Sequence, residues 1–203
     1  YRVEGAHQLH ATRLVCGDRQ LARRFLRTFA LGQTLDGYFL DCWPAYDRLA
    51  RLSQRQLGLT PWGPLLDHGV GFNFDCWQYL LFTGDLDALR EPYPRLVRFM
   101  RYLQSIVRGD GLLPVDDIGV PAVWIDHEAY RVPRHRRCAF NLYVAAMLTR
   151  AFPRIAAALG DGAMAREAEA FGTRLLDAAR AASWADSRGL FVANLPWLAE
   201  AKG

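Results

Sequence analysis

Apolar residues recur at helical spacing along most of the chain, with polar residues between them. One such face runs through the middle of the chain: Leu96, Phe99, Met100, Leu103, Ile106 and Val107. A second face with the same period contains Phe171, Leu175 and Ala178. Apolar side chains three and four positions apart lie on one side of an α-helix. The pattern therefore predicts an all-α protein.

The dipeptide Gly-Asp stands between two helical patterns three times, at Gly17, Gly84 and Gly160. Glycine readily adopts the left-handed backbone that ends a helix, and the aspartate after it can cap the next helix. We therefore expect a helical hairpin around each pair. A second glycine in each unit is expected to end its second helix and open a loop: Gly37, Gly111 and Gly189.

Three helical hairpins follow from this punctuation, over about residues 6–36, 67–110 and 137–189. Their helices are expected over residues 6–16 and 19–31, about 67–83 and 93–108, and 137–159 and 163–182. Pro153 should kink or break the first helix of the third hairpin, because proline has no N–H to donate.

The hairpins are joined by long loops, over residues 37–66 and 111–136. Long ordered loops in a compact helical protein are often functional. Short turns at one end and long loops at the other are typical of an α/α toroid of helical hairpins. The chain would supply about three hairpins of a six-hairpin toroid. We therefore expect the remaining half of the toroid in the parent chain.

A motif in the second hairpin is typical of a known enzyme family. It reads W-x-Y-x-x-x-T-G-D from Trp77 to Asp85 and continues with Y-P-x-L from Tyr93. Further pieces are Q-x-x-D-G at residues 33–37, N-x-Y at 141–143, L-G-D at 159–161 and D-x-R-G-L-F-V at 186–192. In this order and spacing the chain resembles the six-hairpin glycosidases, particularly the α-L-rhamnosidases of glycoside hydrolase family 78.

The resemblance implies a hydrolase that acts on terminal α-L-rhamnosides with two carboxylates, by an inverting mechanism. Glu4 sits at the place of the family's general acid, just before the first helix of the toroid. The family's general base would lie beyond Gly203. From the residues alone, Glu4 is equally an acid in the first turn of a helix, which the helix dipole favours. Position 11, where the family has an aspartate, is Ala11.

Candidate sugar-binding residues lie in the second long loop, in the run Trp124-Ile125-Asp126-His127-Glu128. An aromatic ring can pack on the apolar face of a sugar while carboxylates bind its hydroxyl groups. We therefore expect Trp124, Asp126 and Glu128 to bind substrate. The alternative for the two acids is pairing with Arg131 or Arg134.

Two further candidates come from the other loop and from the start of the second hairpin. Trp43 lies in a loop, where a buried role is less assured, and is a candidate sugar platform. Asp67 and His68 open the second hairpin and could face the same site. Because Asp67 precedes an apolar run, an N-cap role is the simpler interpretation.

Composition narrows the class of protein. The 203 residues are 51% hydrophobic and 23% charged, which excludes a disordered chain. No apolar run approaches the roughly 20 residues that cross a bilayer, so we expect no membrane insertion. The chain shows no secretion signal and begins without a methionine, and we expect it to be a fragment of a longer protein.

Charge and cysteine content exclude other classes. The net charge is +4, but the basic residues, all arginine except Lys202, are scattered, so we expect no nucleic-acid partner. The four cysteines lack metal or redox spacing and favour buried thiols in a reducing, cytoplasmic setting, with secretion left open. No nucleotide-binding motif occurs, and His7, His10 and Glu4 lack zinc-protease spacing, so no cofactor or metal is expected.

Two alternative functions stay open, because a fold does not fix an activity. The toroid could belong to another carbohydrate-active enzyme, such as a glucoamylase-like or trehalase-like hydrolase or a sugar epimerase. It could also be a helical scaffold that binds sugars without turnover, which Ala11 favours slightly.

Overall fold

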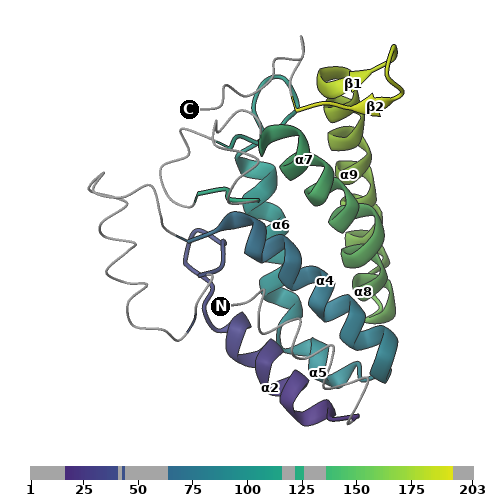
Figure 1. Cartoon of the computed structure of the whole chain (residues 1–203). Coiled ribbons are helices and arrows are strands. Elements are labelled where there is room, and N and C mark those ends of the chain that lie inside the picture. Colours follow the sequence, from purple (N-terminus) through teal and green to yellow (C-terminus); the bar gives the residue numbers. More distant parts are fainter. Residues whose placement is uncertain (1–16, 41–42, 44–63, 116–121, 126–135, 194–203) are drawn as a thin grey trace, which may run out of the picture.

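A computed structural model of the chain describes residues 17–40, 43, 64–115, 122–125 and 136–193. Helices dominate these residues (Figure 1): α2 (Arg19–Ala30), α4 (Leu66–Thr83), α5 (Asp87–Arg90), α6 (Tyr93–Ser105), α7 (Arg136–Ala146), the π-helical turn η2 (Met147–Ala151), α8 (Phe152–Ala158) and α9 (Gly162–Ser183). Strands β1 (Trp184–Ala185) and β2 (Leu190–Phe191) pair antiparallel after α9. The prediction of a helical protein is confirmed, with this small sheet as an addition.

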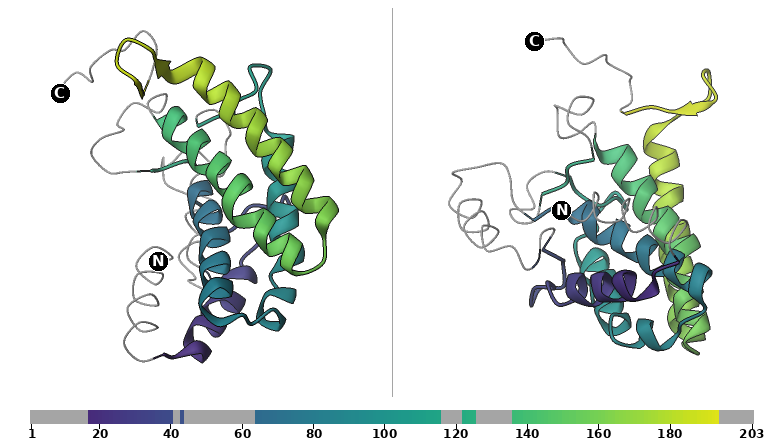
Figure 2. Two further views of the ribbon diagram at one scale, coloured as in Figure 1. Left: turned by 90° about the vertical axis from the view of Figure 1, so that its right-hand side faces the viewer. Right: turned by 60° about the horizontal axis from the view of Figure 1, so that its bottom comes forward.

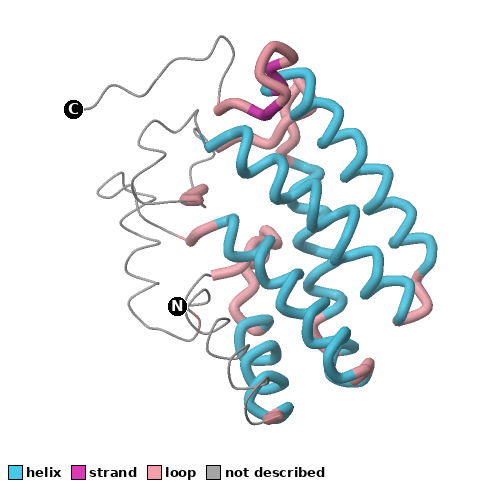
Figure 3. Tube along the Cα trace, turned by 45° about the vertical axis from the view of Figure 1, so that its right-hand side comes forward, coloured by secondary structure: helices cyan, strands magenta, loops and turns pink. Residues whose placement is uncertain are grey.

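All three Gly-Asp pairs have the predicted glycine and aspartate geometry, and the second and third pairs lie between helices as predicted. The helix expected over residues 6–16, before the first pair, lies outside the described residues. Gly17, Gly84 and Gly160 all have φ between 65° and 88°. The aspartate after each glycine accepts from a backbone N–H of the following helix: Asp18 from Gln20 and Leu21, Asp85 from Ala88, and Asp161 from Met164. Figure 3 shows these short turns along one end of the molecule.

The second glycine of each unit also has a positive φ, but it does not end a helix. Gly37 lies in a tight turn that pairs Gln33 with Phe39, seven residues after α2 ends. Gly189 lies between β1 and β2, so the chain forms a β-hairpin there instead of opening a loop. Short-range turn chemistry explains both differences, because a left-handed glycine serves a hairpin turn as well as a helix end.

Pro153 changes the geometry of the third hairpin's first helix without ending it. The π-helical turn η2 ends at Ala151, and Pro153 is the second residue of α8, in its first turn. A missing N–H costs least at a helix start, and a π turn is a common way to absorb an irregularity in a helix. The predicted local disruption is therefore present as a change of helix type.

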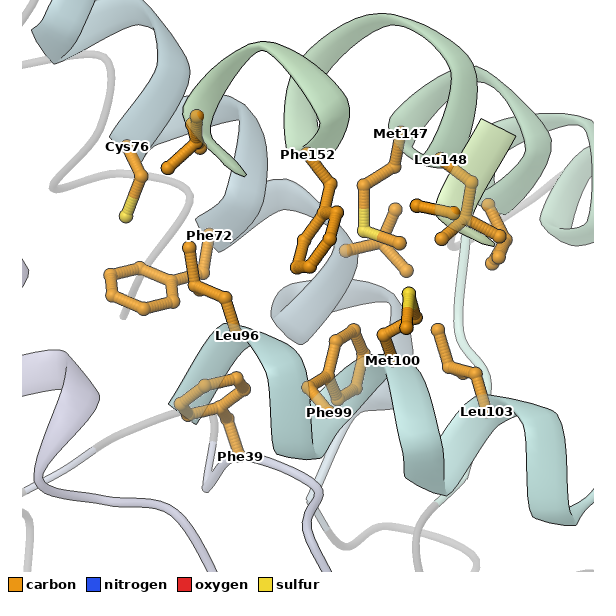
Figure 4. Close-up of a cluster of buried hydrophobic side chains, with 14 of the residues drawn as sticks. Phe39, Phe72, Cys76, Leu96, Phe99, Met100, Leu103, Met147, Leu148 and Phe152 are labelled. Carbon is orange, nitrogen blue, oxygen red and sulfur yellow. The ribbon is translucent and has the colours of Figure 1, made fainter. Parts of the chain in front are cut away.

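The helices pack around one apolar core. Helix α4 lies beside the continuous α7–η2–α8 rod, and α9 packs along the other side of that rod (Figure 2). Helix α2 packs on α4, and α6 packs on α8. Large side chains from α4, α6 and α8 meet between them, with Phe72, Phe99 and Phe152 wholly buried (Figure 4).

Helices α4 and α7 run in the same direction. The rings of Phe74 and Tyr143 stack between them, with centroids 5.4 Å apart and planes 9° from parallel. Phe74 follows Asp67 by seven residues in α4, and Tyr143 follows Arg136 by seven residues in α7. Asp67 and Arg136 both bond the short segment at residues 122–125. The N-terminal ends of both helices therefore lie at the same end of the molecule.

Candidate functional site

The segment at residues 122–125, which we call the strap, crosses the start of α4. The Leu66 N–H donates to the Ala122 carbonyl over 2.8 Å, and the Ala122 N–H donates to the Pro64 carbonyl over 2.9 Å. These two bonds form a short parallel bridge between Leu65 and Ala122. The second long loop is thereby fixed to the helix that opens the second hairpin.

Asp67 holds the strap from the side of α4. Its side chain is buried, with the residue 7% exposed, and Oδ1 accepts the Trp124 N–H over 2.9 Å. The N-cap prediction for Asp67 is wrong, because α4 begins at Leu66 with Leu65 as its N-cap. Asp67 thus lies inside the first turn of α4, and its carboxylate accepts a hydrogen bond from the Trp124 N–H of the strap instead.

Arg136 holds the strap from the side of α7. It is the first residue of that helix, and its guanidinium donates to the Val123 carbonyl over 2.8 Å. Hydrogen bonds to an ionised side chain are about twice as strong as neutral ones. The strap is therefore tied to two parallel helices, by a carboxylate on one and a guanidinium on the other.

The strap ends in a strained backbone conformation at Ile125. Its φ is 62°, and it is the only non-glycine residue with a positive φ in the described part of the chain. The left-handed region crowds a β-branched side chain, so such a residue persists only where its surroundings enforce it. Residues of this kind cluster at binding and catalytic sites.

Two of the predicted site residues contact each other at this end of α4, and a third is their neighbour in the sequence. Asp67 and Trp124 are directly bonded, and His68 stands next to Asp67 in the first turn, only 4% exposed. Trp124 is half-buried. The candidate site is therefore formed by the start of α4, the start of α7 and the strap.

The other predicted residues are not brought into this cluster by the described contacts. Trp43 is 39% exposed and packs against Gly32, where its Cβ leaves no room for a side chain. Phe39 of the same loop packs on Phe72 of α4, with ring centroids 5.1 Å apart. Glu4, Asp126 and Glu128 lie outside the described residues.

Two residues of the site region did not follow from the sequence pattern. Asn141 is wholly buried in α7, accepts the Leu113 N–H over 2.8 Å and donates to the carbonyls of Leu113 and Arg137. These bonds hold Leu113, near the start of the second long loop. In the sequence, the feature that could have indicated this role is a polar amide within an apolar helical face. Arg136 gave no such signal, since arginine is frequent throughout the chain.

An ion pair stabilises the same loop at its beginning. Arg137 at the start of α7 bonds Asp110, whose other oxygen accepts the Leu112 N–H. Burial acts to raise the pKa of Asp110, but the hydrogen bonds from Arg137 and Leu112 outweigh it and lower that pKa below its ordinary value. Adjacent arginines, Arg136 and Arg137, thus hold two different parts of one loop.

Among the residues that the structure describes, no group of three or more His, Cys, Asp or Glu side chains could hold a metal ion. Within the same residues, Cys76 and Cys138 are buried and form no disulfide, as predicted. No helix of these residues is long and apolar enough to cross a membrane. What the site offers is therefore an aromatic ring, a buried carboxylate, an imidazole and a fixed backbone. Comparison with known protein families, with curated proteins and with solved structures gives no match to this chain.

Proposed function

We propose that the chain is the N-terminal half of a six-hairpin α/α-toroid catalytic domain, in a glycoside hydrolase that acts on terminal α-L-rhamnosides. The observation that carries the proposal is one turn design repeated at Gly17, Gly84 and Gly160, at one end of the molecule. The described residues 122–125 of the second long loop lie at the other end of α4, where Trp124 bonds Asp67. In a toroid glycosidase the short turns between paired helices lie at one end of the domain, and the loops that form the substrate site lie at the other.

Glu4 is the proposed general acid, which protonates the leaving glycosidic oxygen. The base that activates water would come from the missing half of the toroid. An inverting pair stands roughly 6.5–9.5 Å apart, which leaves room for that water. Asp67 is a poor candidate for the base, because its carboxylate is buried and already accepts the Trp124 N–H.

Trp124, Trp43, Asp126, Glu128, Asp67 and His68 are the proposed sugar-binding residues. In this role the half-buried ring of Trp124 packs on the apolar face of the sugar. Asp126 and Glu128 follow the strap directly in the sequence and would bind hydroxyl groups. Asp67 acts through the backbone that carries Trp124.

An apolar stripe on α4 supports a partner for the chain. Phe74 and Trp77 are half-buried on it, and Leu81 is 64% exposed. We name these three residues the α4 stripe. Exposed apolar side chains that gather on one face of a helix are typical of a surface that contacts another part of a protein. The remaining toroid hairpins of the parent chain are the proposed cover. The buried thiols of Cys76 and Cys138, which form no disulfide, favour a reducing compartment.

The test is a panel of aryl glycosides offered to the intact parent protein: α-L-rhamnoside, α-glucoside and β-glucoside. We expect cleavage of the rhamnoside, loss of that cleavage in Glu4→Gln, and first release of the product with inverted anomeric configuration. Glu91→Gln is the matched control, because Glu91 pairs with Arg27 on the surface of the hairpins.

Each other result points to one alternative. Rhamnoside cleavage that survives Glu4→Gln would move the acid to another carboxylate. Cleavage of a glucoside alone would favour another toroid hydrolase. Sugar binding without cleavage of any substrate would favour the scaffold without catalysis.

A further inference from the structure

Asp67 and Arg136 form hydrogen bonds with the two ends of one peptide group. The Val123 carbonyl and the Trp124 N–H belong to the same planar unit. The carbonyl accepts from the Arg136 guanidinium over 2.8 Å, and the N–H donates to Asp67 Oδ1 over 2.9 Å. We call this arrangement the peptide clamp.

The charges of the peptide clamp match the dipole of the peptide that it holds. The guanidinium faces the negative carbonyl end, and the carboxylate faces the positive N–H end. Because a peptide unit is planar, two hydrogen bonds at its opposite ends fix the direction of the plane. The position of the Trp124 Cα is thereby set by α4 and α7 together.

We propose that Asp67 and Arg136 are positioning residues, which hold the strap so that the ring of Trp124 is presented to the substrate. This inference rests on the proposed sugar-binding function of Trp124. It assigns Asp67 an indirect role, in place of a direct contact with sugar hydroxyls. It also adds Arg136, which no sequence motif singles out.

The strain at Ile125 supports a positioning role over a purely structural one. A loop that only covered the core could relax to an ordinary φ, whereas Ile125 keeps a φ of 62° one residue after the clamped peptide. A strained φ of this kind persists only where contacts fix the backbone of the neighbouring residues. The peptide clamp and the bridge between Leu65 and Ala122 are those anchors.

The test compares amide hydrogen exchange with substrate kinetics in the full parent protein. Asp67→Ala and Arg136→Met remove one partner of the peptide clamp each. We expect the amides of residues 123–125 to exchange about tenfold faster in both variants, since the Trp124 N–H loses its fixed geometry. For an aryl α-L-rhamnoside we expect KM to rise about tenfold with kcat within twofold, because binding and not the reacting bond is affected.

Two conservative variants serve as controls. Asp67→Asn keeps an oxygen that can accept the Trp124 N–H and should retain most of the exchange protection and most of the affinity. Arg101→Met removes a surface arginine that bonds Glu167 of α9 and not the strap, and should leave KM unchanged. Asp67→Asn also keeps the comparison possible if the alanine variant does not fold.

The outcomes separate this inference from the proposed function. Faster exchange with an unchanged KM, or unchanged exchange in both clamp variants, would overturn the positioning role while leaving rhamnoside cleavage in place. If the wild-type protein neither binds L-rhamnose nor cleaves the aryl rhamnoside, the proposed function fails and takes the positioning role with it.

Discussion

The Tyr93 hydroxyl donates to Asp161 Oδ2 over 2.9 Å and joins the second hairpin to the third. The other oxygen of Asp161 caps α9 by accepting the Met164 N–H. Asp85 is used in the same way one unit earlier, where it accepts from the Tyr79 hydroxyl and from the Ala88 N–H. Asp85 and Asp161 therefore each cap a helix and bind a tyrosine hydroxyl. The capping role follows from the sequence, and the tyrosine bond does not.

Removing the Tyr93 hydroxyl should weaken the contact between hairpins. We expect Tyr93→Phe to lower the free energy of unfolding by about 1 kcal/mol, the typical net value of one hydrogen bond, because Asp161 loses its partner. Urea denaturation followed by circular dichroism measures the change. Asp161→Ser is the companion variant, since serine still caps α9 but cannot serve both partners. An unchanged midpoint in Tyr93→Phe would contradict a stabilising role.

The helices could be predicted from the sequence because their signals are local. Residues 93–108 were expected to be helical, and α6 covers Tyr93–Ser105. The Gly-Asp turns were also predicted, since glycine conformation and aspartate capping depend on adjacent residues. The peptide clamp could not be predicted, because Asp67 and Trp124 are 57 positions apart and their contact depends on how a loop folds back.

Gly172 allows α9 to approach the π-helical turn. A Cβ at this position would lie 2.8 Å from the Cβ of Leu148 and 2.8 Å from the methyl group of Thr149. We expect Gly172→Ala to destabilise the protein by about 1–3 kcal/mol, because overpacking outweighs the better helix propensity of alanine. Gly162→Ala is the control, since its nearest neighbour is the end of the Arg166 side chain at 3.5 Å. Equal melting temperatures for both variants would refute the close packing.

Relieving the strain at Ile125 should offset part of the cost of removing its side chain. Ile125 packs against the core, but glycine adopts a positive φ without steric cost, so Ile125→Gly should lower the free energy of unfolding by about 1–3 kcal/mol less than the same change at an unstrained isoleucine. Ile106→Gly is the matched control, because Ile106 is similarly buried but has a φ of −103° and should be destabilised by the same substitution. Thermal melts of both variants measure the contrast. A loss of stability in Ile125→Gly as large as in Ile106→Gly would exclude strain at this residue.

Two half-buried tyrosines, Tyr93 and Tyr102, should make stability depend on alkaline pH. Burial and the hydrogen bond to Asp161 raise the pKa of Tyr93 well above its ordinary value, and burial with nearby Tyr38 and Asp36 raises the pKa of Tyr102 to about 12. The unfolded chain releases these protons near pH 10. Their contribution is therefore complete below about pH 10 and is lost as the pH rises toward the folded-state values. Urea midpoints should be level from pH 8 to about 10 and should fall as the pH rises further to about 12, less so in Tyr93→Phe. A profile that stays flat above about pH 10 would contradict the raised pKa values.

The α4 stripe should drive self-association of the 203-residue chain. Leu81 is 64% exposed on it, beside the half-buried rings of Phe74 and Trp77. Burying a leucine side chain is worth about 1.5–3 kcal/mol, so Leu81→Gln should weaken self-association about tenfold or more in sedimentation experiments. Leu35→Gln is the control, because Leu35 is 98% exposed in a turn away from the stripe and should leave association unchanged. A wild-type chain that stays monomeric at high concentration and melts cooperatively at high temperature would argue that α4 needs no further cover, and hence against a half-toroid.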